Sequence, residues 1–161
     1  MNDLNEKISI WLGDEKFDFE TRETLGIDRD NLDEEIAKQA STCSWFLVQR
    51  AKAAAMIADV EAEIKDMEAV LDPKIRAKAK EDGEKITEAG IKAAMQRDEQ
   101  RGSLKEKFRK LMAAEGLLGA FVDAFRQRKD MLVSLGFSRR QEMSFSSEQI
   151  EQIKKNLEGG S

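Results

Sequence analysis

Histidine is absent from this chain of 161 residues. Histidine is the commonest general base near neutral pH and the commonest metal ligand, so its absence removes most routes to hydrolytic or metal-dependent chemistry. The sequence also has no phosphate-binding loop of the Gly-x-x-x-x-Gly-Lys type and no nucleophile paired with a base. We therefore predict that the protein is not an enzyme, with no catalytic residues, no metal site and no cofactor.

Cysteine is nearly absent as well. Cys43 is the single cysteine, which excludes an intrachain disulfide or a cysteine-based zinc site and fits a reducing compartment. No segment approaches the roughly 18 apolar residues of a membrane span, and the N-terminus is acidic. We expect a cytoplasmic protein with no membrane contact.

Proline occurs once and tyrosine not at all, whereas Ala, Glu, Lys, Leu, Gln and Arg are frequent. This composition is typical of long helices and provides little for a sheet, so we predict an all-α fold. Between residues 31 and 71, apolar or small residues recur every three or four positions, as in a long amphipathic helix with a coiled-coil seam. The predicted seam consists of Ile36, Ala40, Cys43, Leu47, Ala51, Ala54, Ala58, Ile64, Met67 and Leu71.

Pro73 follows this segment and should stop or kink the helix, because it has no N–H to donate and its ring crowds the preceding turn. A short second helix would then carry Lys74 to Lys80 and end near Gly83. Thr87 is a good cap for a return helix that keeps its apolar spacing up to Gly136. Residues 31–143 are thus predicted to form a long antiparallel helical hairpin.

Both ends of the chain are predicted to be separate small elements. Residues 1–30 form an acidic segment in which Leu4, Ile8 and Trp11 suggest a short helix, followed by an irregular linker. Residues 144–161 suggest a short C-terminal helix with Ile150, Ile153 and Leu157 on one face, and then a tail.

The apolar faces of the two long helices are wider than one partner helix covers, which predicts a symmetric homo-oligomer in the form of a helical bundle or ring. The residues that widen these faces are Trp45, Phe46, Val48, Ile57, Val60, Phe121 and Met131.

Charge is distributed unevenly, with −10 on residues 1–72 and +6 on residues 101–140. A first cluster of cations lies at the expected hairpin tip and could hold a phosphate backbone: Lys74, Arg76, Lys78, Lys80 and Lys85. The alternative is that these side chains complement a helix C-terminus and keep the tip solvated. Oligomerisation would turn the tips into a basic belt. No aromatic residue interleaves with this cluster to stack on bases.

Two further clusters on the return helix are secondary candidates for DNA contact. Pairing with the acidic first helix is their alternative role. The first, which begins at Arg101, contains Lys105, Lys107, Arg109 and Lys110, and the second contains Arg126, Arg128, Lys129, Arg139 and Arg140.

A series of short motifs then runs in a recognisable order. Ile27-Asp28 leads into Leu32-x-x-Glu35, Ala37 and Trp45, and Lys74-x-Arg76 marks the tip. The return helix opens with Lys85-Ile-Thr-Glu-Ala-Gly-Ile-Lys92 and closes with Ala124-Phe-Arg-Gln-Arg-Lys-Asp-Met-Leu132 and Leu135-Gly-Phe137. In this order the chain resembles the UvsY-type recombination mediators of tailed bacteriophages, from about Gly26 to Met143.

The resemblance implies a ring-forming protein of DNA recombination, repair and replication. Such a protein binds single-stranded DNA, displaces single-strand-binding protein and loads a RecA-like recombinase. It implies DNA contact at Lys74 and Arg76, extended by Lys78 and Lys80, and a location in the host cytoplasm. The competing hypothesis is a non-enzymatic helical scaffold or adaptor that acts only through protein–protein contacts.

Overall fold

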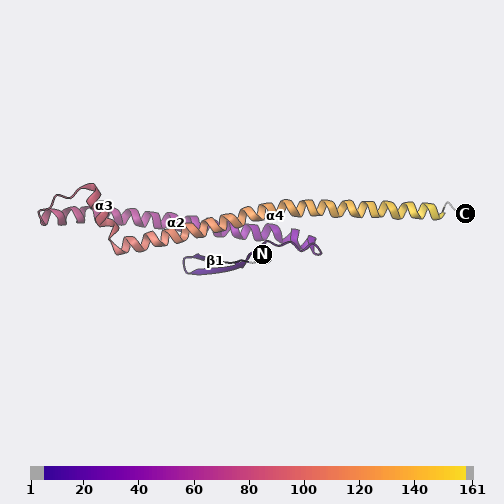
Figure 1. Cartoon of the computed structure of the whole chain (residues 1–161), viewed down its shortest axis with the longest axis horizontal. Helices are drawn as coiled ribbons and strands as arrows, with labels where there is room; N and C mark the ends of the chain where they lie inside the picture. The colour runs from indigo at the N-terminus through magenta and orange to yellow at the C-terminus, as the bar shows by residue number, and fades with distance from the viewer. Residues whose placement is uncertain (1–5, 159–161) are drawn as a thin grey trace.

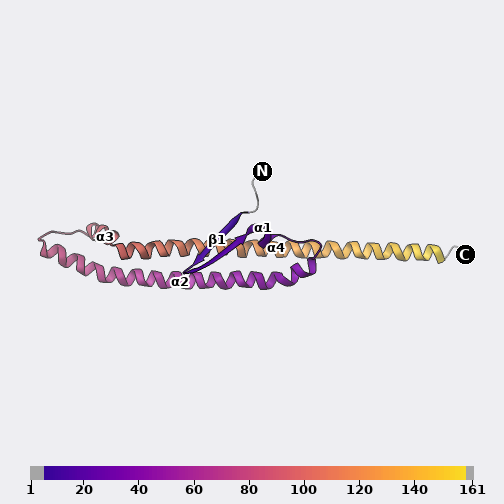
Figure 2. The same cartoon turned by 90° about the horizontal axis from the view of Figure 1, so that it is seen from below.

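A computed structural model describes residues 6–158, with side chains to residue 154. The chain is mostly helical and forms a long rod, in which α2 (Leu32–Glu81) and α4 (Glu99–Glu158) lie side by side (Figures 1 and 2). The short α3 (Glu88–Gln96) covers one end of the rod. Two strands, β1 (Lys7–Leu12) and β2 (Glu15–Glu20), and the short α1 (Thr21–Leu25) precede the long helices. The predicted antiparallel helical hairpin is confirmed.

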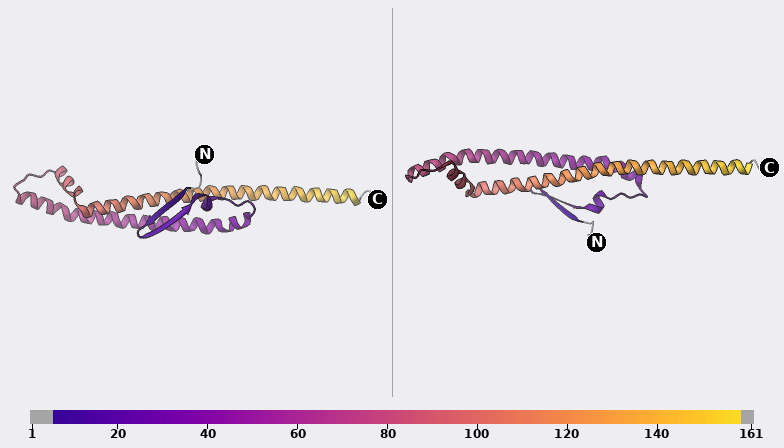
Figure 3. Two further views of the ribbon diagram at one scale, coloured as in Figure 1. Left: turned by 60° about the horizontal axis from the view of Figure 1, so that its bottom comes forward. Right: turned by 45° about the horizontal axis from the view of Figure 1, so that its top comes forward.

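The all-α prediction is wrong for the N-terminal segment, where β1 and β2 form an antiparallel hairpin instead of a helix. Ile8, Ile10 and Leu12 occupy every second position of β1. Because alternate side chains of a strand point to the same face, all three point toward the helices. Ile10 pairs with Phe17 across the strands. An isolated two-stranded hairpin is marginal in water, so packing on the helices must stabilise this one (Figure 3).

An aromatic cluster joins the β-hairpin to both long helices. Phe46 of α2 is 1% exposed, and its ring centroid lies 4.8 Å from that of Phe121 and 5.2 Å from that of Phe125 on α4. The ring centroid of Phe19 on β2 lies 5.1 Å from that of Phe46, and the ring centroid of Trp45 lies 5.0 Å from that of Phe46. These contacts fix the position of the sheet across the helix pair.

The turn between the strands depends on Gly13, which has φ +60° at the first central position. A Cβ atom here would also lie 2.9 Å from Cε of Met56 on α2. We expect Gly13→Ala to destabilise the fold by about 1–2 kcal/mol, because a non-glycine residue is strained at this φ. Urea unfolding followed by circular dichroism measures the change.

Gly116→Ala is the matched control, since a Cβ atom at this position on α4 meets open space. Alanine is the better helix former, so Gly116→Ala should stabilise the protein by up to about 1 kcal/mol. Equal effects of the two substitutions would contradict the proposed strain at the turn.

Pro73 does not stop the first helix, and the separate short helix predicted after it is also wrong, because α2 continues through this residue to Glu81. The next two turns are held by tertiary packing, in which Ala79 of α2 and Ile91 of α3 are buried. This packing outweighs the hydrogen bond that Pro73 cannot donate. The expected end near Gly83 is confirmed, with φ +71° at this glycine. The amide of Glu84 donates to the carbonyl of Ala79, as in a Schellman motif.

The return segment is divided into two helices. Thr87 caps α3 as predicted, and its hydroxyl accepts a hydrogen bond from the amide of Gly90. Arg97 ends α3, and the Asp98 carboxylate then caps α4 by accepting from the amide of Arg101 at 2.8 Å. The two helices therefore meet at a short break that the sequence pattern did not predict.

The core seam of α2 differs from the predicted one. Buried residues recur at intervals of seven, at Leu32, Gln39, Phe46, Ala53 and Val60. Ile64 of the predicted seam is buried, and Cys43, Met67 and Leu71 are half-buried. The remaining predicted seam residues are exposed: Ile36, Ala40, Leu47, Ala51, Ala54 and Ala58. The helix has two apolar stripes, and the one with the bulky Phe46 faces α4 because it buries more surface.

At the C-terminal end, α4 runs without a break past Gly136 and Ser146, so the predicted separate helix after residue 143 is wrong. The last third of α4 extends beyond the start of α2 as a single helix (Figure 1). The predicted tail at residues 159–161 and the side chain of Leu157 lie outside the described residues.

Candidate nucleic-acid interface

The predicted tip cluster lies at one end of the rod, on the last turns of α2 and in the loop to α3. Lys74, Lys78, Lys80 and Lys85 are exposed, and none forms an ion pair with a described residue. Five carboxylates share this end, so residues 72–88 have a formal charge of zero. The tip therefore presents cations on a surface with no net charge. Several copies of the tip, brought together in an oligomer, would be needed to attract a polyanion strongly.

Arg76 is engaged within the tip. Its Nε lies 2.5 Å from a carboxylate oxygen of Asp72, and its terminal nitrogen lies 2.7 Å from a carboxylate oxygen of Glu88. The hydrogen bond to Asp72 is the main cause that raises the pKa of Arg76 above its usual value, and the hydrogen bond to Glu88 is the second. This side chain fastens α3 to α2, and the structure thus gives it a role that competes with DNA contact.

The other cations of α2 divide between two sides of the helix. Lys74 follows Met56 by 18 residues, which is about five turns, so both lie on the same side of an ideal helix. Met56 contacts the turn of the β-hairpin. Lys78 is one further turn along this side, whereas Lys80 points to nearly the opposite side. Lys74 and Lys78 therefore share a side of the rod with the β-hairpin.

Beside the hairpin turn, an exposed aromatic ring stands next to cations. Trp11 is 54% exposed on the outward face of β1, and Nζ of its cross-strand partner Lys16 lies 5.7 Å from the ring centroid. A shallow depression of about 250 Å³ separates Trp11 from α4. It is lined by Trp11, Gly13, Ser103, Glu106, Lys107, Lys110 and Leu111.

The charges of this depression are partly compensated. Nζ of Lys110 lies 2.8 Å from Oε1 of Glu106, and this hydrogen bond lowers the pKa of the Glu106 carboxyl below its ordinary value. Lys16 pairs with Asp18 at 3.0 Å. Lys107 is exposed and has no ion pair with any described residue. It is the cation at this site that is most available to a phosphate.

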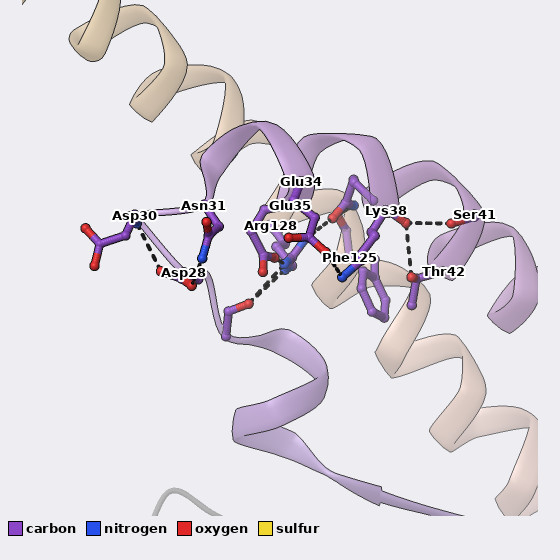
Figure 4. A network of polar contacts seen from close by, with 12 residues as sticks. Asp28, Asp30, Asn31, Glu34, Glu35, Lys38, Ser41, Thr42, Phe125 and Arg128 are labelled. Atoms are coloured by element: carbon purple, nitrogen blue, oxygen red, sulfur yellow. Dashed lines mark hydrogen bonds and ion pairs between the residues drawn. The ribbon is translucent and has the colours of Figure 1, made fainter.

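Arg128 must be removed from the secondary candidates, because it is 8% exposed and its guanidinium is fully engaged (Figure 4). It donates to the carbonyl of Gly26 at 3.0 Å, to Oε1 of Gln39 at 2.5 Å, and to the carboxylate of Glu35. Gln39 in turn donates to the carbonyl of Phe125 at 2.6 Å. Arg128 therefore ties α4 to α2 and to the segment before it.

The alternative role of the return-helix cations, pairing with the first helix, is confirmed for Arg128 with Glu35 and for Arg101 with Glu68. Arg126 pairs within its own helix with Asp123, and Arg109 donates to the carbonyl of Lys105. No ion pair to a described residue is made by Lys105, Lys107, Lys129, Arg139 or Arg140. The last three lie far from the tip, so the structure does not unite the three clusters into one surface.

Trp11 is the residue that sequence reasoning left out of the candidate DNA contacts. It lies between Ile10 and Leu12, both buried, and strand alternation therefore places it on the outward face. That signal is present in the sequence, but reading the segment as a helix concealed it.

Comparison of the chain with family models, curated proteins and solved structures finds no significant match. The resemblance to the UvsY-type mediators stays a prediction. Across residues 6–158, no helix combines the length and apolarity of a membrane span. The same part of the chain holds no group of three or more acidic or cysteine side chains arranged as a metal site.

Proposed function

We propose that the protein binds single-stranded DNA along the side of the rod that carries the β-hairpin, and that it acts as a recombination mediator. In this role a homo-oligomer displaces single-strand-binding protein and loads a RecA-like recombinase. The observation that carries the proposal is the exposed Trp11 beside Lys107, on the same side as Lys74 and Lys78.

This arrangement combines the two interactions that bind single strands without sequence preference. Stacking of a base on an aromatic ring contributes about 1–3 kcal/mol, and lysines hold the phosphates. Met56 contacts the hairpin turn beside Trp11, and Lys74 follows it by 18 residues on the same helix. At 1.5 Å per residue this separation is about 27 Å, which leaves room for several nucleotides between the tip and Trp11. Nearby carboxylates weaken each contact, so repetition in an oligomer would supply the affinity.

Fluorescence anisotropy with a labelled oligothymidylate tests the interface. We expect binding at about 50 mM salt that weakens strongly at about 200 mM. Trp11→Ala should weaken it about 5- to 100-fold through lost stacking, and Lys107→Glu should weaken it and reduce its salt dependence. Lys65→Glu is the matched control, because Lys65 is exposed on the side of α2 opposite Met56.

Absence of binding at the lower salt would reject the proposed function. Binding that responds equally to Lys107→Glu and Lys65→Glu would reject this surface. Stimulation of a RecA-like recombinase's ATPase, on DNA coated with single-strand-binding protein, then tests the loading step.

The scaffold hypothesis draws support from the neutral tip and from Arg76, which is held by two carboxylates. A protein that associates with other proteins but fails to bind the oligonucleotide would favour it.

A further inference from the structure

The core-facing stripe of α4 continues beyond the helix that covers it. Leu118, Phe125 and Leu132 are buried against α2 at intervals of seven residues. Met143 follows Phe125, and Ile150 follows Leu132, by 18 residues or about five turns, which places both on the same side of α4. They are nevertheless 63% and 56% exposed, because this part of α4 extends beyond Leu32, where α2 begins. We call residues 140–154 the overhang.

The overhang extends alone beyond the paired helices (Figure 2), and a single helix of this length is marginal in water on its own. Ile153, which lies 21 residues after Leu132 on the same stripe, is 58% exposed. This stripe continues the one that packs on α2 within the hairpin. Another helix could therefore pack on the overhang in the same way that α2 packs on the preceding turns of α4.

A second apolar surface exists on the flank of α2, about a quarter of a turn or more around the helix from Phe46 and the stripe that faces α4. Ile36, Leu47 and Val48 are 47%, 42% and 53% exposed there. Small residues separate them and allow another helix to approach closely. We call this the outer face; it consists of Ile36, Ala40, Leu47, Val48, Ala51, Ala54 and Ala58. Ala40 and Leu47 are seven residues apart, as are Met143 and Ile150.

We propose that the overhang of each protomer packs on the outer face of α2 in a second copy of this chain. The two copies are related by a two-fold axis perpendicular to the rods. The α4 helices then run antiparallel, with the two α2 helices end to end between them. Each α4 is covered first by its own α2 and then by the partner's, so one contact occurs twice and is self-complementary. This specifies an interface for the homo-oligomer of the proposed function.

The charges agree with the direction that this symmetry imposes. Since α2 and α4 are antiparallel within one chain, the two-fold axis makes the overhang parallel to the partner's α2. Arg139 and Arg140 lie at the start of the overhang, and the partner's α2 would begin beside them with the acids Asp33 and Glu34. Cations therefore meet carboxylates at this end of the contact in the parallel arrangement.

Mass photometry and light scattering of the full chain test the proposal. We expect dimers, or assemblies built from dimers, at micromolar concentration. Ile150→Asp and Leu47→Asp should each shift the population toward monomer by at least tenfold in the dissociation constant. Phe145→Asp is the control, since Phe145 is 62% exposed on the other side of the overhang and should leave the assembly unchanged. Circular dichroism confirms that each variant is folded.

Cysteine crosslinking in a Cys43→Ser chain identifies the surfaces in contact. Ile150→Cys combined with Ala40→Cys or Leu47→Cys should give a disulfide-linked dimer under mild oxidation. A monomeric wild type, an assembly indifferent to Ile150→Asp, or efficient crosslinking by Ile150→Cys alone would each overturn the proposal. None of these results depends on DNA, so failure here is distinguishable from failure to bind the oligonucleotide.

Discussion

Arg128→Ala is expected to destabilise the folded chain by about 3–5 kcal/mol, the usual effect of removing one partner from a buried ion pair. The substitution leaves the Glu35 carboxylate and Oε1 of Gln39 without their common donor, in a region where Arg128 is only 8% exposed. It also removes the hydrogen bonds to the carbonyl of Gly26. Urea unfolding at equilibrium measures the change in the free energy of unfolding.

Arg126→Ala provides the comparison, because Arg126 lies two residues before Arg128 on the same helix and differs from it mainly in environment. Its side chain is 66% exposed and forms an ion pair with Asp123. Such surface pairs contribute about 0–1 kcal/mol, so Arg126→Ala should be close to neutral. If the two arginines proved equally dispensable, the network in Figure 4 would not be the structural anchor described above.

Phe46→Ala should have an effect of similar size, about 3–5 kcal/mol, through loss of buried surface and formation of a cavity. The Phe46 ring is 1% exposed and contacts rings from β2, α2 and α4. Because it joins all three elements, its removal should also loosen the β-hairpin. Near-ultraviolet circular dichroism, which reports the packing of Trp45, should lose intensity along with the unfolding free energy.

Phe137→Ala is the matched substitution at an exposed site, since Phe137 is 55% exposed on α4. A surface change of this kind is usually within about 0.5 kcal/mol. A large loss of stability from Phe137→Ala, with little from Phe46→Ala, would place the core elsewhere in the molecule.

The long helices were predictable because their signals are local. The cap at Thr87 and the left-handed glycine at Gly83 act over a few residues, and both are found where the sequence placed them. The antiparallel hairpin follows from two long apolar patterns joined by a short connection. These features need no knowledge of distant contacts.

The remaining errors concern choices made by tertiary packing. Pro73 continues a helix because α3 covers the next turns, and the seam of α2 is the stripe with Phe46 because α4 packs against it. Likewise, Arg128 has the composition of a surface cation, and only its partners Gln39 and Glu35 make it a buried anchor. At the candidate DNA surface, Lys74 and Lys78 were predicted from the sequence as contacts. Trp11 was not, because its exposure depends on the β-hairpin.

The anchor at Arg128 also bears on the order in which the hairpin closes. Near the tip, Glu68 and Arg101 are separated by 33 residues of chain, whereas Arg128 and Gly26 are separated by 102. The entropy lost on closing a loop increases with its length, so the contacts near the tip form at lower cost than those at the other end. Closure is therefore expected to proceed from the tip toward Arg128, and fraying to proceed in the reverse direction. The buried network stands where the chain would otherwise open first.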